Sequence, residues 1–219
     1  MKIAIIGAEN VSSSLGRVWA KAGHYIIFGV RNAPQVQAGR TNAPMPGIGV
    51  GTAIMPLLDA AMKADIIVLA CPWPAVEDTI KALGDLSGKI VIDATNPLTL
   101  AGDGSLSLAV GSTSSGAEEI ERLAGGSMVV KAFNIYGPEN YANSEYPNTG
   151  GLKPVMFYCG DNDDAKAKVH QLAADLGFEP VDTGGLGMSR SLEPLALLWI
   201  RLSIRDGRNP NFAWARLTR

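Results

Sequence analysis

The chain has 219 residues, 47% of them hydrophobic, and a formal net charge of −2 with an isoelectric point near 5.7. This length and apolar fraction allow one domain, or one domain with an appendage, around a sizeable core. The weakly acidic balance argues against a surface for nucleic acid or anionic membranes, because such surfaces require a basic face.

Short β-branched runs alternate with helical patterns along the first half of the chain. We expect strands at 2–6, 25–30, 66–70 and 89–93, and helices at 13–22, 56–63 and 76–83. Residues 39–51 are rich in turn-forming residues and suggest at most a brief strand at 48–50.

A polar loop is expected at 99–113, before the second half of the pattern. Ser115 and Glu118 have the spacing of a capping box and begin a helix that runs to Leu123. Further strands are expected at 128–133, 155–158 and 179–182, and helices at 164–176 and 189–204. Such alternation of buried strands with helices predicts an α/β fold with a doubly wound, mostly parallel sheet, in which ligands bind at the carboxyl ends of the strands.

The chain is expected to be a soluble cytoplasmic protein. Cys71 and Cys159 both lie in apolar, strand-like runs, which is typical of buried thiols in a reducing compartment. The apolar run at the N-terminus is too short for a signal peptide. The apolar run at 194–200 is too short to span a bilayer.

The stretch GAENVSSSLG, residues 7–16, follows the first strand at the place where a dinucleotide-binding protein has its glycine-rich turn. Gly7 supplies the first glycine of G-x-G-x-x-G, Glu9 replaces the second, and Ser12 is a small third residue. A carboxylate about 5 Å from a phosphate charge costs about 3 kcal/mol at an effective dielectric constant near 20, and about 1 kcal/mol if water screens it. We therefore expect a weakened pyrophosphate site; the alternative is a structural turn that binds no cofactor.

The end of the second strand bears on the choice of cofactor. NAD-binding proteins place an acid there, whereas this chain has Arg31 in the run Gly29-Val30-Arg31-Asn32. A guanidinium matches a 2′-phosphate with charge-assisted hydrogen bonds, so NADP(H) is predicted over NAD(H). The alternative is a solvated surface arginine.

Polar and aromatic residues follow the next two strands, which we expect beside the first strand on the ligand side. Trp73, after Cys71 and Pro72, offers an apolar wall for a nicotinamide or acceptor ring. The alternative is that its side chain fills the core. Asn96 suits a carboxamide or ribose contact, or else an Asx-turn before proline.

The strand at 128–133 is followed by Asn134 and Tyr136, whose chemistry suits contact with a substrate. Lys131 is interpreted as a strand residue with a solvated head in preference to a proton donor. His24 and His170 are interpreted as structural, so no catalytic side chain and no metal site is predicted.

Seven segments resemble the NADPH-dependent coenzyme F-420 reductase family, over almost the whole chain. They are MKIAIIGAENVSSSLG, GVRN, ADIIVLACPW, IVIDATNPL, VVKAFNIYG, SLEPLALLWIRLSI and NFAWARLTR. The resemblance implies a Rossmann fold in which helices near the C-terminus close a cleft over a deazaflavin acceptor. It also implies a pyrophosphate turn at Ala8, Glu9, Asn10 and Val11, a 2′-phosphate site at Val30, Arg31 and Asn32, and a nicotinamide neighbourhood at Cys71, Pro72, Trp73, Asn96 and Ile135.

The implied activity is direct hydride transfer between NADP(H) and an acceptor, which is F-420, another flavin-like ring, or a small imine or carbonyl compound. A cofactor-sensing or regulatory protein without turnover is the alternative. Residues 1–184 are assigned to an NADP-binding Rossmann domain and 185–219 to a helical segment that completes the substrate cleft.

A homodimer is also expected. The helix at 189–204 carries more apolar surface than one edge of the sheet would cover. The alternative is that this helix packs on its own sheet. The residues concerned are Leu192, Leu195, Ala196, Trp199 and Leu202.

Overall fold

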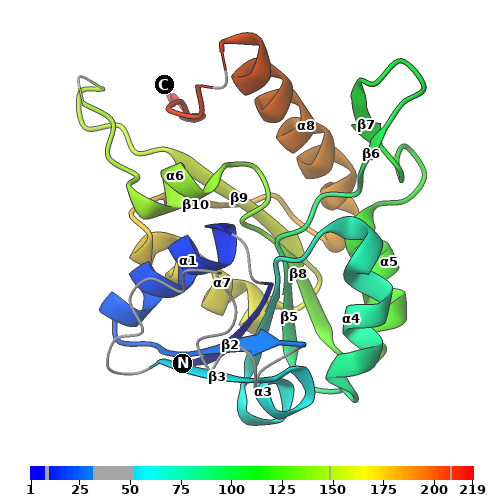
Figure 1. Ribbon diagram of the computed structural model, residues 1–219. Helices are drawn as coiled ribbons and strands as arrows, with labels where there is room; N and C mark the ends of the chain where they lie inside the picture. The colour runs from blue at the N-terminus through cyan, green and yellow to red at the C-terminus, as the bar shows by residue number, and fades with distance from the viewer. Residues whose placement is uncertain (8–9, 32–51, 148, 208) are drawn as a thin grey trace.

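The computed structural model describes residues 1–7, 10–31, 52–147, 149–207 and 209–219. These residues form one twisted sheet of eight strands with helices on both faces (Figure 1). The order across the sheet is β10-β9-β8-β5-β4-β1-β2-β3. The strands are β1 (Lys2–Ile6), β2 (Tyr25–Val30), β3 (Thr52–Pro56), β4 (Ile66–Leu69), β5 (Ile90–Asp93), β8 (Met128–Lys131), β9 (Val155–Gly160) and β10 (Glu179–Asp182).

All neighbouring strands in this sheet pair in parallel except β8 and β9, which are antiparallel. The doubly wound, mostly parallel α/β fold predicted from the alternation is therefore confirmed. The helices are α1 (Asn10–Lys21), α3 (Leu57–Lys63), α4 (Val76–Leu83), α5 (Gly116–Leu123), α6 (Pro138–Ala142), α7 (Asp163–Asp175) and α8 (Ser189–Arg205), with short 3-10 turns η1 (Trp73–Ala75) and η2 (Leu186–Met188). None of these helices is long and apolar enough to cross a membrane.

The two faces of the sheet carry separate hydrophobic clusters. Ile3 and Ile5 of β1 pack in one cluster with side chains from α1, α7 and α8. Ala4 and Ile6, which point to the other face, pack with side chains from α3, α4 and α5. Strands buried on both sides explain why the sequence shows continuous apolar runs rather than alternation.

Several short elements were not predicted. β3 is an edge strand that pairs with β2, and its side chains are only half-buried. The expected loop at 99–113 contains the hairpin of β6 (Leu98–Leu100) and β7 (Leu106–Leu108), which packs beside α8. α6 is a five-residue helix with Pro138 in its first turn. Such brief elements lack a periodic signal, and the strand suggested at 48–50 lies outside the described residues.

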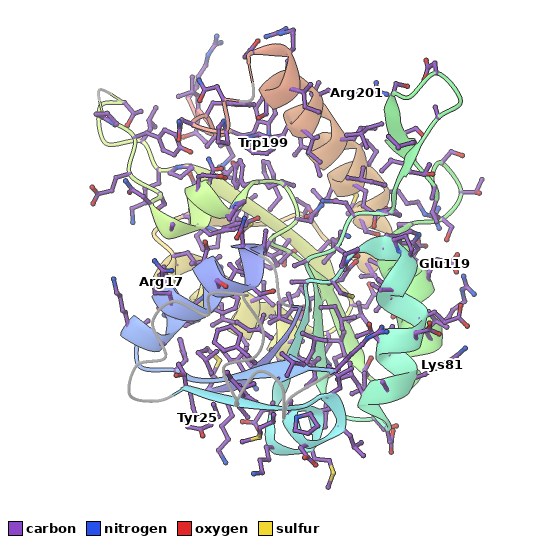
Figure 2. The ribbon with its side chains drawn as sticks, viewed as in Figure 1. Arg17, Tyr25, Lys81, Glu119, Trp199 and Arg201 are labelled. Carbon is purple, nitrogen blue, oxygen red and sulfur yellow. The ribbon has the colours of Figure 1, made fainter. Side chains whose placement is uncertain are left out.

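The segment that follows η2 is tied to the sheet. Ala196 and Trp199 of α8 belong to the same cluster as Ile3 and Ile5. Trp199, labelled in Figure 2, stacks on Phe212 with ring centroids 5.3 Å apart. Beyond α8, the carbonyl oxygen of Trp214 accepts a 2.9 Å hydrogen bond from the backbone nitrogen of Val155. The C-terminal segment thus shares the core of the sheet.

The face of α8 predicted to meet a partner is largely covered by the chain itself. Leu192, Ala196 and Trp199 are buried. Leu198 and Ile204 remain about half exposed, at 48% and 54%. The three buried residues therefore pack on the chain's own sheet, whereas Leu195 and Leu202 are half-buried.

Candidate cofactor-binding site

The carboxyl ends of β1, β4, β5 and β8 lie next to one another at one edge of the sheet. This order brings together the segments that follow Ile6, Leu69, Asp93 and Lys131. β5 lies beside β4 and is one strand further from β1 than expected. The predicted site segments therefore share one edge, which is where parallel sheets bind ligands.

Gly7 lets the first turn lie against the end of β4. Its φ is +145°, and a Cβ atom added there would lie 2.4 Å from the carbonyl oxygen of Ala70. No side chain fits such an approach without a backbone shift. Ser12 is buried behind this turn, and its hydroxyl has no hydrogen-bond partner among the described residues. A tight turn backed by a small residue fits the approach of a pyrophosphate.

Helix α1 begins directly after this turn. Asn10 is its first residue and is exposed, whereas Val11 packs against the core. Asn10 also lines a pocket of about 280 Å³ between α1 and α6. Two predicted turn residues, Ala8 and Glu9, lie outside the described residues.

Arg31 follows β2 directly and reaches across the edge to α4. Its Nη2 donates a 2.9 Å hydrogen bond to Oγ1 of Thr79 and lies 3.5 Å from the carbonyl oxygen of Ala75. The Thr79 hydroxyl in turn donates to the Ala75 carbonyl at 2.6 Å. Arg31 is exposed, whereas Val30 before it is buried. This arrangement orients a guanidinium at the ligand edge; Asn32 lies outside the described residues.

The segment after β4 is partly open. Cys71 is half-buried and Pro72 is exposed. Burial raises the pKa of the Cys71 thiol, an effect that its contact with Thr79 reduces. Trp73 is half-buried, and a Cβ atom added at Gly116 would lie 3.1 Å from its ring. The ring therefore packs against the start of α5 while part of it stays accessible.

Asn96 and Asn134 bind each other. Nδ2 of Asn134 donates to Oδ1 of Asn96 at 3.0 Å, and Nδ2 of Asn96 donates to the backbone oxygen of Asn134 at 2.8 Å. Asn134 is buried, and its Oδ1 has no hydrogen-bond partner in the described part of the chain. Phe133, just before it, has a φ of +58°, a strained value for a bulky residue. The strained backbone at Phe133 thus positions Asn134 against Asn96.

The next two residues are buried. Ile135 is fully buried. The hydroxyl of Tyr136 donates to the backbone oxygen of Val155 at 2.9 Å and accepts from the backbone nitrogen of Trp214 at 3.0 Å. Burial raises the pKa of this phenol. The prediction that Tyr136 touches a substrate is therefore not kept, because its hydroxyl is buried and holds the C-terminal segment.

The interpretation of Lys131 as a solvated strand residue is wrong. Its side chain is completely buried, and Nζ lies 2.7 Å from Oδ2 of Asp93, 2.7 Å from the carbonyl oxygen of Thr95 and 3.0 Å from Oε1 of Glu193. Burial opposes the charged amine, but the two carboxylates outweigh it and raise the lysine pKa above its ordinary value.

Glu193 links this lysine to α5. Its carboxylate accepts hydrogen bonds from the backbone nitrogens of Gly116 and Ala117, at 3.0 and 3.2 Å. Sequence reasoning missed Asp93 and Glu193. The sequence does contain one indication of the Asp93–Lys131 pair. The two residues carry opposite charges and end two apolar strands, which pair in register in the structure.

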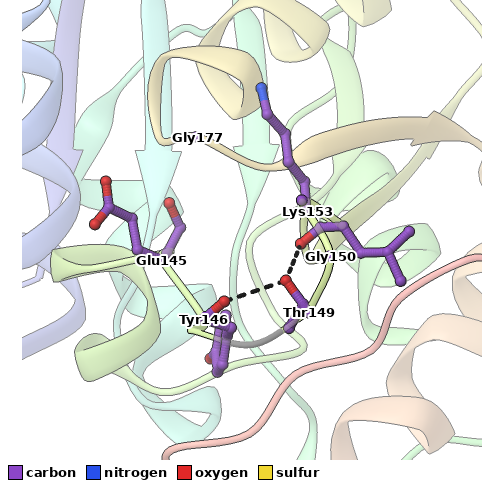
Figure 3. Close-up of a pocket in the computed structure, with 9 residues that line it drawn as sticks. Glu145, Tyr146, Thr149, Gly150, Lys153 and Gly177 are labelled. Atoms are coloured by element: carbon purple, nitrogen blue, oxygen red, sulfur yellow. Dashed lines mark hydrogen bonds between the residues drawn. The ribbon is translucent and has the colours of Figure 1, made fainter.

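A second pocket lies in the segment after α6 (Figure 3). It has a volume of about 370 Å³ and its lining includes Tyr146, Lys153 and Gly177. The Thr149 hydroxyl lies 3.1 Å from the backbone oxygens of Tyr146 and Leu152. None of the predicted site residues that the structure describes lines this pocket, so it is separate from the edge described above.

Comparison with known proteins agrees with this geometry. Residues 2–97 match the family model described as NADP oxidoreductase, coenzyme F420-dependent. The chain is 30% identical over 215 residues to the F420-dependent NADP reductase of Methanocaldococcus jannaschii. This match covers 94% of this chain and 93% of that protein. It is 31% identical over 220 residues to the corresponding protein of Methanothermobacter thermautotrophicus, covering 94% and 90%.

The chain belongs to this family of NADP oxidoreductases. The resemblance seen in the sequence is confirmed, and with it the assignment to an oxidoreductase family that uses NADP(H). A candidate F420-dependent NADP reductase of Arthrobacter sp. FB24 has a solved structure that is 28% identical, covers 99% of this chain and 100% of that one, and gives a TM-score of 0.86.

Two further matches span only part of the matched protein. A reductive aminase from Aspergillus terreus, solved with NADPH, is 20% identical with a TM-score of 0.62, which supports the fold alone. The rat metalloreductase STEAP3 is 28% identical over 200 residues. The match covers 90% of this chain, but the chain spans only 37% of the length of that protein.

Proposed function

We propose that this protein transfers a hydride between NADP(H) and the deazaflavin coenzyme F420. The observation that carries the proposal is the pairing, at one edge of the sheet, of a turn that admits only glycine at Gly7 with a guanidinium held at Arg31. The names of the two archaeal relatives support F420 as the acceptor. Flavin-like rings and small imines or carbonyl compounds are the other acceptors to be tested.

The described residues fit such a cofactor. Gly7 admits close approach of a pyrophosphate, and the N-terminus of α1 adds backbone N–H groups at Asn10 and Val11. Arg31 binds the 2′-phosphate from the end of β2, beside Val30. The nicotinamide, when bound, supplies the hydride.

The protein orients the ring and keeps water away from it. Cys71, Pro72 and Trp73 form one wall of the site in this proposal. The half-buried Asn96 offers hydrogen bonds to the carboxamide, and the buried Asn134 holds it in place through the hydrogen bond from its Nδ2 to Oδ1 of Asn96. Hydride transfer between two conjugated rings needs no acid or base from the protein, only alignment. Residues 185–219 complete the acceptor side of the cleft in this proposal.

A binding titration and an activity assay test the proposal. NADPH and NADH are titrated against the purified protein while the fluorescence of its four tryptophans is followed. Reduction of F420 by NADPH is then followed from the absorbance of the deazaflavin, beside riboflavin and a cyclic imine. The proposal expects preferential NADPH binding and turnover with F420. Binding without turnover on any acceptor would instead support a cofactor-sensing protein, and absence of binding would contradict both.

We also propose that the protein is a homodimer. The support is the exposed apolar surface of Leu198 and Ile204 on α8, to which Leu100 of β6 adds another exposed side chain. Light scattering at micromolar concentration tests this, and a monomeric mass contradicts it.

A further inference from the structure

Three charged side chains are buried directly below the ligand edge. Asp93 and Lys131 end the adjacent strands β5 and β8, and Glu193 reaches them from α8. Their exposed fractions are 0%, 0% and 1%. The proposed mechanism gives these residues no role.

The hydrogen bonds fix the charge of this buried triad. Asp93 accepts from Lys131 and from both the backbone nitrogen and the hydroxyl of Thr95, at 2.8 and 2.7 Å. Glu193 accepts from Lys131 and from two backbone nitrogens of α5. Among the described residues each carboxylate contacts only hydrogen-bond donors, so none of them accepts a carboxyl proton. Two carboxylates and one ammonium give a net charge of −1, partly offset by the amides of α5.

The triad is coupled to the residues proposed to hold the nicotinamide. Nζ of Lys131 donates to the carbonyl of Thr95, next to Asn96. Nδ2 of Asn134 donates a 3.3 Å hydrogen bond to the carbonyl of Leu192, the residue before Glu193. An added Cβ at Gly116 would lie 3.1 Å both from Oε1 of Glu193 and from the Trp73 ring.

We propose that the net negative charge of Asp93, Lys131 and Glu193 makes the site favour NADP⁺ over NADPH. The nicotinamide ring carries a positive charge when oxidised and none when reduced, so a fixed negative charge nearby acts on one form only. Away from the ring the two forms share the same contacts, at Gly7 and Arg31, so the ratio of their dissociation constants isolates the effect. This inference rests on the proposed function.

The test measures the dissociation constants of NADP⁺ and NADPH by tryptophan fluorescence. Glu193→Gln and Asp93→Asn each remove one negative charge with little change in shape. Each should raise the ratio of the NADP⁺ to the NADPH constant by about fourfold, the effect of one charge over roughly 10 Å at an effective dielectric constant of about 40. The double variant Lys131→Met with Glu193→Gln restores a net charge of −1, and its ratio should return toward that of the natural protein.

The double variant separates charge from structure, because added structural damage would move its ratio further away or weaken both cofactors equally. Lys166→Met is the matched control, since Lys166 also contacts two carboxylates, Asp163 and Asp182, but lies on α7 near the surface. Its ratio should not change. An unchanged ratio in both Glu193→Gln and Asp93→Asn, while both cofactors still bind, overturns this inference alone. Failure of the natural protein to bind either form overturns the proposed function.

Discussion

Nη2 of Arg31 donates a 2.9 Å hydrogen bond to the hydroxyl of Thr79. This bond links the residue that directly follows β2 to the first turn of α4. The arginine is exposed, and its guanidinium stands where NAD-binding proteins carry an acid.

Arg31→Ala should weaken NADPH binding by about 1.5–3 kcal/mol, the value of a hydrogen bond to a charged group, and leave NADH nearly unchanged. Thr79→Val is the companion variant, since it removes the hydroxyl that orients the guanidinium but keeps the charge. It should have a smaller effect in the same direction. Fluorescence titrations with both cofactors measure these changes, and equal losses for NADPH and NADH would contradict the assignment.

The turn after β1 offers a test of close approach. Gly7→Ala places a methyl group 2.4 Å from the Ala70 carbonyl at a φ of +145°. We expect loss of NADPH binding and a destabilisation of at least about 2 kcal/mol, because the backbone must move. Gly23→Ala is the control, since Gly23 also has a positive φ, of +90°, but no atom within 4 Å. It should cost about 1 kcal/mol and keep NADPH binding. Similar binding by the two variants would show that the turn does not shape the site.

The order of the main strands and helices was predictable because the helices carry a periodic pattern and the central strands are continuous apolar runs. The runs IAII, IIVL and IVI are buried on both sides, and their continuous apolar character indicates this directly. Arg31 and Gly7 could be proposed as site residues from the sequence because the roles proposed for them depend on their position after a strand.

The surroundings of Lys131 could not be predicted in the same way. Its burial depends on Glu193, which arrives from α8 near the end of the chain, and no local pattern records that contact. The hydrogen bonds of the Tyr136 hydroxyl could not be predicted for the same reason, since Val155 and Trp214 belong to later segments. Long-range contacts of buried polar side chains need the three-dimensional arrangement.

Lys131→Met should destabilise the protein by about 3–5 kcal/mol, because it leaves two buried carboxylates without their cation. Urea denaturation measures the loss, and Lys166→Met should cause a much smaller one, since its partner Asp163 is almost fully exposed. The lysine pKa is raised above 10.5, so its stabilisation is fully present below pH 10.5 and is lost only as the pH rises further. The difference from the natural protein should therefore stay constant between about pH 7 and 9, and a decline within this range would contradict the buried pairing.

The two cysteines should differ in reactivity. Burial raises the pKa of the Cys159 thiol to about 12 and also raises that of Cys71. Iodoacetamide should therefore label the half-buried Cys71 slowly near neutral pH, faster as the pH rises, and leave the buried Cys159 unlabelled until the protein unfolds. Because Cys71 is proposed to line the nicotinamide site, saturating NADPH should slow its labelling. Mass spectrometry of the labelled peptides measures both effects, and labelling of Cys71 that is independent of NADPH would place the cofactor elsewhere.

Glu9 is the residue that departs from the glycine-rich motif, and it lies outside the described residues, between Gly7 and the start of α1 at Asn10. A carboxylate before a helix N-terminus either competes for the backbone N–H groups that a pyrophosphate would use or repels the incoming phosphates. Glu9→Gly removes both effects and restores the small residue that close approach requires. The affinity for NADPH should rise by about tenfold or more. If repulsion dominates, the gain is larger at low salt, because ions screen exposed charges. Titrations at two salt concentrations measure the change, and a dissociation constant that stays the same or rises would show that Glu9 is not what weakens this turn.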